Sequence, residues 1–330
     1  MIKPAFYITI LLFVLLNHSQ AQPNLIYNGD FEEYSSCPQY ESSPFQNPKE
    51  IEKCIGWKAP TYGTSDYFNT CATNPTISVP ANALGIQNPY SGNGYLGGSF
   101  TNYGGGAGND GYSGIMWWEY IQGQLISQLE ENKIYKLSME VSLAEYSDLM
   151  INEIGAYFSD FPISSPNTAA LTVNPQCVFY NSNHFGDTLN WQYVETIFIA
   201  SGHERYVTIG NFRNDTSTDT LRRYDISPTY VNPYVTYFYI DNVVLTSVNI
   251  DIPNIFTPNN DGINDLWSLP FSDASKKVSI LNRWGNLIYE NDLENFAWDG
   301  KTQKGEECLD GIYFYRINNT NIAGFIQLVR

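Results

Sequence analysis

The residues best suited to hold a ligand are aromatic and acidic side chains in two loop-rich stretches. Sugar rings present apolar faces that stack on Trp and Tyr, while carboxylates and amides form hydrogen bonds with sugar hydroxyls. Trp57, Trp191 and most strand tyrosines are expected in the core instead. The sequence therefore predicts a carbohydrate site with these candidate contacts: Tyr62, Asp66, Tyr67, Tyr103, Asp110, Tyr112 and Trp117.

Catalytic patterns are scarce in this sequence. Residues 106–111 satisfy GxGxxG, but they follow a loop and open no helix, so the context of a dinucleotide site is missing. GxSxG, HExxH and P-loop patterns are absent, and His203 beside Glu204 is interpreted as a solvated turn. A glycoside hydrolase needs only two carboxylates roughly 5 to 9.5 Å apart. We predict a non-catalytic protein and keep a carbohydrate-active hydrolase as the alternative.

The N-terminus has the pattern of a secretory signal peptide. Lys3 precedes an apolar run from Ala5 to Leu16, and Ser19-Gln20-Ala21 fits a small-x-small cleavage rule. The run is shorter than the roughly 20 apolar residues that span a membrane. We therefore predict a signal peptide over 1–21 and a mature chain without a transmembrane segment.

The five cysteines of this predicted exported chain favour disulfide bonds. The sequence alone leaves three pairings open for the four cysteines before position 250; we favour Cys37 with Cys71 and Cys54 with Cys177. Cys308 is then free or intermolecular. No CxxC occurs, which argues against a zinc site.

Composition and charge limit the partners of the chain. Aromatic residues make up 15%, with 25 Tyr, and Gly and Pro contribute 25 and 17 residues for turns. The formal net charge is -17; residues from Pro253 onward contain ten acidic and seven basic groups, so the part before carries -14. Such acidity opposes phosphate backbones, and we predict no nucleic-acid partner.

Strand patterns recur along the part before Pro253. From Tyr135 to Leu143 apolar and polar residues alternate with a period of two, which predicts a half-buried strand. Similar runs are separated by Asn, Gly, Ser and Pro clusters and lie at 154–158, 193–199, 206–212 and 236–248. Many strands with long irregular connections predict an all-β protein whose large module is a jelly-roll β-sandwich.

Two terminal segments of this module carry a resemblance. NLIYNGDFEEY, from Asn24, and YFYIDNVVL, from Tyr237, resemble the first and last strands of galactose-binding-like jelly rolls, a group with many carbohydrate-binding modules. That resemblance implies neighbouring terminal strands and a structural calcium ion held partly by Glu32 and Asp241. A further set of motifs is similar to an uncharacterised module of exported Bacteroidota proteins, and no activity travels with it: CIGW, TSDYFNTC, YIQGQL and YVTIGNF.

The C-terminal segment carries a more specific set of motifs. IFTPNNDGINDLW, VSILNRWGNLIYE, AWDGK, DGIYFYRI and GFIQLVR follow one another over 254–330. Together they resemble the gliding-motility-associated C-terminal domain, the type B sorting signal of the Bacteroidota type IX secretion system. The resemblance implies export by that machinery with an outer-membrane sorting partner. The matching residues are Asn259, Asp261, Gly262, Asn264, Asp265, Arg283, Trp284, Gly285, Trp298, Asp299, Gly300, Asp310, Gly311 and Arg330.

The same segment can be interpreted from its residues alone. NRWGNLIYE contains a glycine turn between two apolar runs and predicts a hairpin in a small β-sandwich, with Trp284 and Trp298 in the core or against turns. Asn260 stands where the family has Gly, and Asn tolerates a positive φ. NNDGIND lacks the first and last carboxylates of an EF-hand loop, so a plain Asx turn or a looser calcium turn remains.

These observations predict three segments: a signal peptide at 1–21, a jelly-roll module at 22–250 and a sorting domain at 251–330. We expect a secreted or cell-surface protein that passes through the periplasm and binds carbohydrate without catalysis. The alternatives are a hydrolase on the same sandwich and a structural or adhesion component.

Overall fold

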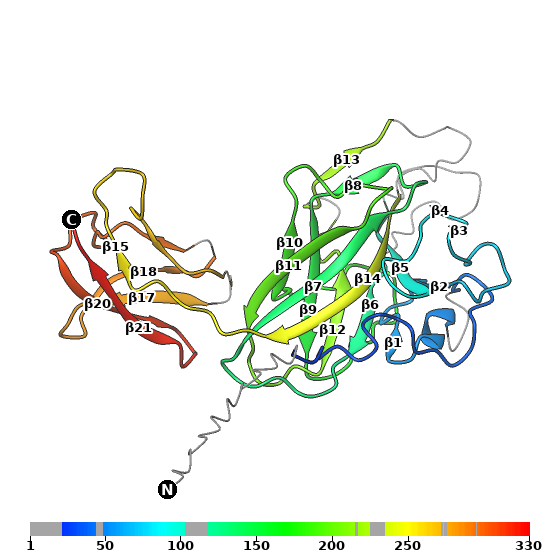
Figure 1. Ribbon diagram of the computed structural model, residues 1–330, viewed down its shortest axis with the longest axis horizontal. Coiled ribbons are helices and arrows are strands. Elements are labelled where there is room, and N and C mark those ends of the chain that lie inside the picture. Colours follow the sequence, from blue (N-terminus) through cyan, green and yellow to red (C-terminus); the bar gives the residue numbers. More distant parts are fainter. Residues whose placement is uncertain are drawn as a thin grey trace, which may run out of the picture.

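The computed structural model describes residues 22–43, 49–102, 118–214, 217–224, 235–271, 273, 276–294 and 296–330. Within these residues the regular elements are strands, apart from one 3-10 helix, η1 (Glu50–Lys53). Figure 1 shows a large unit of long crossing strands, which is joined through a short segment after β14 (Val235–Ser247) to a smaller C-terminal unit. The prediction of an all-β protein is confirmed.

The large unit is a sandwich of two five-stranded sheets whose pairings are antiparallel. The first sheet has the order β1 (Trp57–Lys58), β6 (Ile121–Gln124), β12 (Tyr206–Gly210), β9 (Glu153–Ser159) and β10 (Cys177–Tyr180). The second has the order β11 (Gln192–Ile199), β7 (Ile134–Leu143), β14, β5 (Gly94–Asn102) and β2 (Asp66–Asn69). Two small pairs complete the unit: β8 (Leu149–Ile151) with β13 (Thr220–Arg222), and β3 (Ala81–Asn82) with β4 (Gly85–Ile86). The predicted jelly-roll sandwich is therefore confirmed, and so are the five predicted strand runs.

The main core lies between the two sheets because alternate residues of each strand point inward. Leu137, Met139 and Val141 of β7 are fully buried there, together with Ile209 of β12 and Ile240 of β14. These inward faces explain why a period of two in the sequence located the strands.

Strand β7 differs from the predicted half-buried strand because its polar face is also covered. Ser138, Glu140 and Ser142 are only 7%, 4% and 0% exposed. The segment 70–93 lies over this outer face, where Ile77 joins a second aromatic cluster with Tyr239. Burial raises the pKa of Glu140 above its usual value. Because the covering segment comes from elsewhere in the chain, the local sequence of β7 does not indicate that its polar face is buried.

The N-terminal segment runs beside β14, as the resemblance implied. Leu25 donates its backbone N–H to Leu245 (2.8 Å), and Val243 donates to Gly29 (2.7 Å). Asn24 adds side-chain hydrogen bonds to both Val243 and Leu245, each of 2.8 Å. The start and end of the large unit are thus hydrogen-bonded neighbours.

The C-terminal unit is a smaller sandwich. Its five-stranded sheet has the order β15 (Ile255–Phe256), β21 (Ala323–Leu328), β20 (Gly311–Ile317), β17 (Lys277–Leu281) and β18 (Leu287–Asp292). A short pair completes the unit: β16 (Trp267–Ser268) with β19 (Ala297–Trp298). Trp298 is fully buried, whereas Trp284 is 75% exposed at the turn of the predicted β17–β18 hairpin and lies against Arg283.

The structure confirms one of the two predicted disulfides and contradicts the other. Cys37 and Cys71 are bonded, whereas Cys54, Cys177 and Cys308 are free and buried. Cys54 precedes β1 and Cys177 opens β10, which are opposite edges of the first sheet. Four strand spacings give a separation of roughly 19 Å, whereas a disulfide requires Cα atoms within about 7 Å. Local sequence could not reveal that strand order.

We predict a single intramolecular disulfide in the exported protein. Cys37→Ser should lower the free energy of unfolding by about 2–4 kcal/mol, because the bridge restricts a long loop of the unfolded chain. Nonreducing peptide mass spectrometry identifies the disulfide, and denaturant unfolding measures the free energy of unfolding. The double variant with Cys71→Ser is the control and should cost no more than the single one. A peptide joining Cys54 to Cys177 would contradict the corrected assignment.

Candidate functional site

The outer face of the first sheet is divided between a covered part and an open part. The loop 160–175 covers one region, where Leu171 packs with Trp118 and Tyr120 in a small separate cluster. Tyr120 fixes the loop, because its hydroxyl accepts the N–H of Leu171 (2.9 Å) and donates to the carbonyl of Asn211 (2.7 Å). Next to this cluster the sheet remains open.

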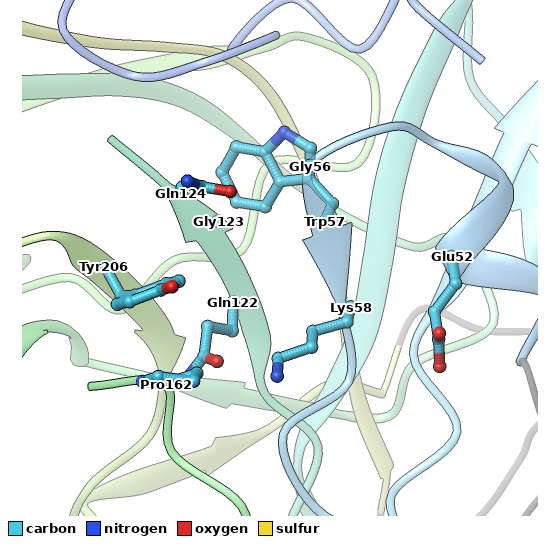
Figure 2. A pocket seen from close by; sticks show the side chains of 9 residues that line it. All are labelled: Glu52, Gly56, Trp57, Lys58, Gln122, Gly123, Gln124, Pro162 and Tyr206. Atoms are coloured by element: carbon cyan, nitrogen blue, oxygen red, sulfur yellow. The ribbon is translucent and has the colours of Figure 1, made fainter. Parts of the chain in front are cut away.

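A pocket of about 330 Å³ lies at the open part. Figure 2 shows it between β1, β6 and β12, with Pro162 of the covering loop at one side. Its lining residues are Glu52, Gly56, Trp57, Lys58, Gln122, Gly123, Gln124, Pro162 and Tyr206.

Strand register brings four polar side chains of the pocket to one face. Lys58 of β1 is directly opposite Gln122 of β6, and Tyr206 of β12 is opposite Gln124. Directly opposed residues of antiparallel strands point to the same side, and residues two apart in one strand do so as well. The polar row is therefore fixed by backbone pairing and does not depend on a flexible loop.

Trp57 forms a wall of the pocket from the core side. Its indole N–H donates to the carbonyl of Asn28 (2.8 Å), and only 3% of the residue is exposed. Its ring fills the space beside Gly123, where an added Cβ would lie 2.6 Å from the ring. The prediction that Trp57 belongs to the core is confirmed, and Gly123 is required for this close approach.

Gln122 leaves an unpaired acceptor at the base of the pocket. Its side-chain N–H donates to Thr208 Oγ1 (2.9 Å), and the residue is 1% exposed. Its Oε1 has no hydrogen-bond partner within the described part of the chain. A buried acceptor without a donor is costly, by about 1–3 kcal/mol. A ligand hydroxyl could supply the missing donor.

The chemistry of the pocket suits recognition of hydroxyl groups. Tyr206 presents a ring and a hydroxyl, and Gln124 presents an exposed amide. Glu52 is the one carboxylate among the lining residues, all of which the structure describes. Hydrolysis by two carboxylates would need a second one here. The pocket therefore has the groups for binding and lacks the pair for that reaction.

The predicted ligand contacts lie elsewhere. Tyr62 is 52% exposed but does not line this pocket. Tyr67 is fully buried and its hydroxyl donates to the carbonyl of Phe31 (2.9 Å). Asp66 is 6% exposed and accepts from Tyr237 Oη (2.8 Å). Tyr67 and Asp66 thus have structural partners in place of a face for a ligand, which corrects their predicted role. The remaining candidates lie outside the described residues: Tyr103, Asp110, Tyr112 and Trp117.

Asp66 belongs to a buried polar group that also contains Glu119. Burial, followed by the nearby charge of Glu119, raises the pKa of Asp66 well above its usual value. Glu119 accepts the backbone N–H groups of Thr64 (2.8 Å) and Ser99 (2.7 Å). Both carboxyl groups have hydrogen-bond donors in the protein, as buried polar groups require.

Sequence reasoning missed Lys58, Gln122, Gln124 and Tyr206 because it searched loops for aromatic residues. One signal was available in the motif YIQGQL, where the two glutamines stand two residues apart. In a strand this spacing puts both amides on the same face. Only the pairing of β6 with β1 and β12 shows which other residues join them.

Glu32 and Asp241, the predicted calcium ligands, have hydrogen-bond donors in the chain. Glu32 accepts the backbone N–H groups of Asn93 (2.6 Å) and Gly94 (3.0 Å). Asp241 is fully buried and accepts those of Tyr90 (2.8 Å), Ser91 (3.1 Å) and Asn242 (2.6 Å).

These donors do not fit a cation shared by the two carboxylates. An N–H group directed at a carboxylate oxygen repels a cation at the same position, and Ca²⁺ takes six to eight oxygen ligands. No group of three or more acidic, His or Cys residues suited to a metal occurs among the described residues. Burial raises the pKa of Asp241 to about 7. The calcium ion stays a prediction, and the N–H donors argue against it.

The N–H donors to Glu32 and Asp241 predict how the protein responds to removal of calcium. Because N–H groups satisfy both carboxylates, a chelator should leave the melting temperature of the protein unchanged. Thermal melts with calcium and with chelator, for the natural protein and for Asp241→Ala, provide the measurement. A lower melting temperature on chelation that is absent in Asp241→Ala would establish the calcium site instead.

The first sorting motif folds as the Asx-type turn that the sequence analysis kept open. Asp265 accepts the backbone N–H groups of Asn260 (2.6 Å) and Gly262 (2.8 Å), and Asp261 accepts that of Ile263 (2.8 Å). Asn259 accepts that of Asp261 (3.0 Å). Asn260 and Asn264 have φ values of 63° and 54°, so Asn serves at the position where the family has Gly.

The terminal residue of the chain organises the later sorting motifs. Arg330 donates to the carbonyls of Cys308 (2.6 Å) and Gly300 (3.3 Å) and pairs with Asp310 (3.5 Å). Asp299 accepts the N–H of Lys301 (3.1 Å). Gly300, Gly311 and Gly285 have φ values of 81°, 152° and 81°, which favour glycine. The motif residues therefore fix turns and the C-terminus.

Comparison with known proteins identifies the C-terminal unit. Residues 250–328 match the CHU_C type IX secretion signal domain. The chain therefore carries a type IX secretion signal, which indicates secretion or export to the cell surface. No helix of the described residues is long and apolar enough to cross a membrane. The comparison with curated proteins found no match.

Solved structures similar to the large unit include carbohydrate-binding modules and an adhesin domain. TmCBM61 in complex with β-1,4-galactotriose has 10% identity and a TM-score of 0.30, covering 68% of this chain and 99% of that chain. The CBM22-1 xylan-binding domain from Paenibacillus barcinonensis has 9% identity and a TM-score of 0.32, covering 66% and 100%. The K1 cleaved adhesin domain of Lys-gingipain from Porphyromonas gingivalis W83 has 14% identity and a TM-score of 0.27, and the match covers 59% of this chain and 92% of that chain.

Proposed function

We propose that this protein is an exported, non-catalytic carbohydrate-binding protein, whose jelly-roll unit binds glycan in the pocket of the first sheet. The observation that carries the proposal is the unpaired, buried Oε1 of Gln122 beside the side chains of Lys58, Gln124 and Tyr206. Together they offer an acceptor, donors and one aromatic ring within one pocket. Neighbouring hydroxyls on a ring with an apolar face match such a set.

The position of the pocket supports this proposal. The three strands that supply the polar row are held by continuous backbone pairing, so the row is in place before a ligand arrives. A preorganised site loses little conformational entropy on binding. The pocket is also on the large unit, and none of its lining residues belongs to the sorting domain. We include an outer-membrane sorting partner in the proposal.

Glycan binding should depend on the polar row. Tyr206→Ala and Gln124→Ala should each weaken binding about tenfold, because each removes hydrogen bonds and, for Tyr206, ring contact worth roughly 1.4 kcal/mol. A glycan array followed by calorimetry on the full-length protein measures the change. Tyr193→Ala is the matched control, since Tyr193 is 54% exposed on β11 of the other sheet.

Three results would contradict the proposed function in different ways. Absence of binding across the array would favour the structural or adhesion alternative. Release of reducing sugar from a bound glycan would favour the hydrolase alternative. Equal losses in Tyr193→Ala and Tyr206→Ala would place the binding site away from the pocket.

Export should depend on the C-terminal unit. Removal of residues 254–330 should retain the large unit in the periplasm, because the signal at 250–328 is then lost. The truncated unit should still fold, since the main core is formed by residues between Ile26 and Leu245. Cell fractionation locates the protein, and circular dichroism of the retained unit is the control for folding. Normal surface display of the truncated chain would contradict the sorting role.

A further inference from the structure

Lys58 is the single cation that lines the pocket, whose lining residues are all described. Three other lysines of the large unit have carboxylate partners: Lys53 with Glu50 (2.7 Å), Lys133 with Glu130 (2.8 Å) and Lys136 with Glu195 (3.0 Å). Lys58 has neither an ion pair nor a side-chain hydrogen bond to any part of the chain that the structure describes. An ammonium that lines the pocket without a protein partner is available to a ligand.

The direction of the Lys58 side chain is equally informative. Figure 2 shows Lys58 extending from β1 toward Gln122 and Pro162, whereas Glu52 lies on the opposite side of Lys58. Glu52 instead accepts the backbone N–H of Lys49 (3.3 Å). The one carboxylate of the pocket therefore leaves the ammonium unpaired, and the ammonium faces the unpaired acceptor of Gln122.

The pairing of β1 with β6 makes this arrangement specific. Lys58 and Gln122 are directly opposed in register, so their side chains leave the sheet from neighbouring points about 4.5–5.5 Å apart at Cβ. A positive donor and a neutral acceptor thus stand together at the base of the pocket. A ligand that pairs with both groups carries an acceptor for the ammonium, which a negative group provides most strongly, and beside it a hydroxyl.

We propose that the pocket selects an anionic sugar residue, such as a uronate or a sulfated sugar, within an otherwise sparsely charged glycan. This inference rests on the proposed function. The anionic group pairs with the Lys58 ammonium, and an adjacent hydroxyl donates to Gln122 Oε1. The net charge of -14 on the part of the chain before Pro253 repels densely charged polyanions. A glycan with isolated anionic sugars is attracted by the Lys58 ammonium and is repelled by the acidic module less than a densely charged polyanion.

The test compares ligands that differ only in charge. Full-length protein is screened on an array that pairs neutral glycans with the same glycans carrying one uronate, and with the same glycans carrying one sulfate. We expect the anionic member of a bound pair to bind at least tenfold more tightly than the neutral member, as a charge-assisted hydrogen bond would produce. The uronate and sulfate arms decide which anion is preferred.

Variants of Lys58 assign the preference to the pocket. Lys58→Gln should reduce the preference for the anionic member to less than about twofold, and Lys58→Arg should preserve the preference. Lys136→Gln, on the other sheet, should change the affinity for neither the neutral nor the anionic glycan. Equal affinity for neutral and anionic members in the natural protein, or an anionic preference that survives Lys58→Gln, overturns this inference and leaves the proposed function intact. Failure of every glycan to bind overturns both.

Discussion

Backbone pairing of β14 is the interaction on which the rest of the structure depends. This strand of 13 residues pairs with β7 along one edge and with β5 along the other, and its second half also holds the N-terminal segment through Val243 and Leu245. Backbone hydrogen bonds on both sides satisfy polar groups that burial would otherwise leave costly. The same strand ends immediately before the C-terminal unit. One strand therefore closes the large sandwich and connects it to the sorting signal.

Coverage of the outer faces decides where the large unit can meet a ligand. The segment 70–93 covers part of the second sheet, and the loop 160–175 covers part of the first. Both coverings bury aromatic residues that a sequence would offer as sugar contacts, including Tyr95 and Tyr120. The open part of the first sheet is lined mainly by polar side chains. Binding in this protein is consequently expected to rely on hydrogen bonds and charge more than on ring stacking.

Carboxylates have a structural role in both units. In both, acidic side chains accept backbone N–H groups in turns: Glu204 does so for Gly202 (3.0 Å), and Asp265 does so for Gly262 (2.8 Å). Such contacts fix the loops through charge-assisted hydrogen bonds. The strongly acidic composition is thus partly structural. Lys58 lines the pocket without a carboxylate partner among the described residues, and this position makes it informative about the ligand.

The sequence by itself determined the all-β class, the principal strands and the C-terminal sorting domain. These follow from local information: a period of two, turn residues such as Asn260, and contiguous motifs. Tertiary structure decided what depends on strand order. It placed Cys54 and Cys177 at opposite edges of a sheet, buried Asp66 and Tyr67, and aligned Lys58 with Gln122 and Tyr206 with Gln124. The physical reason is that strands distant in sequence pair through backbone atoms common to all residues, so local side-chain patterns do not record which strands become neighbours.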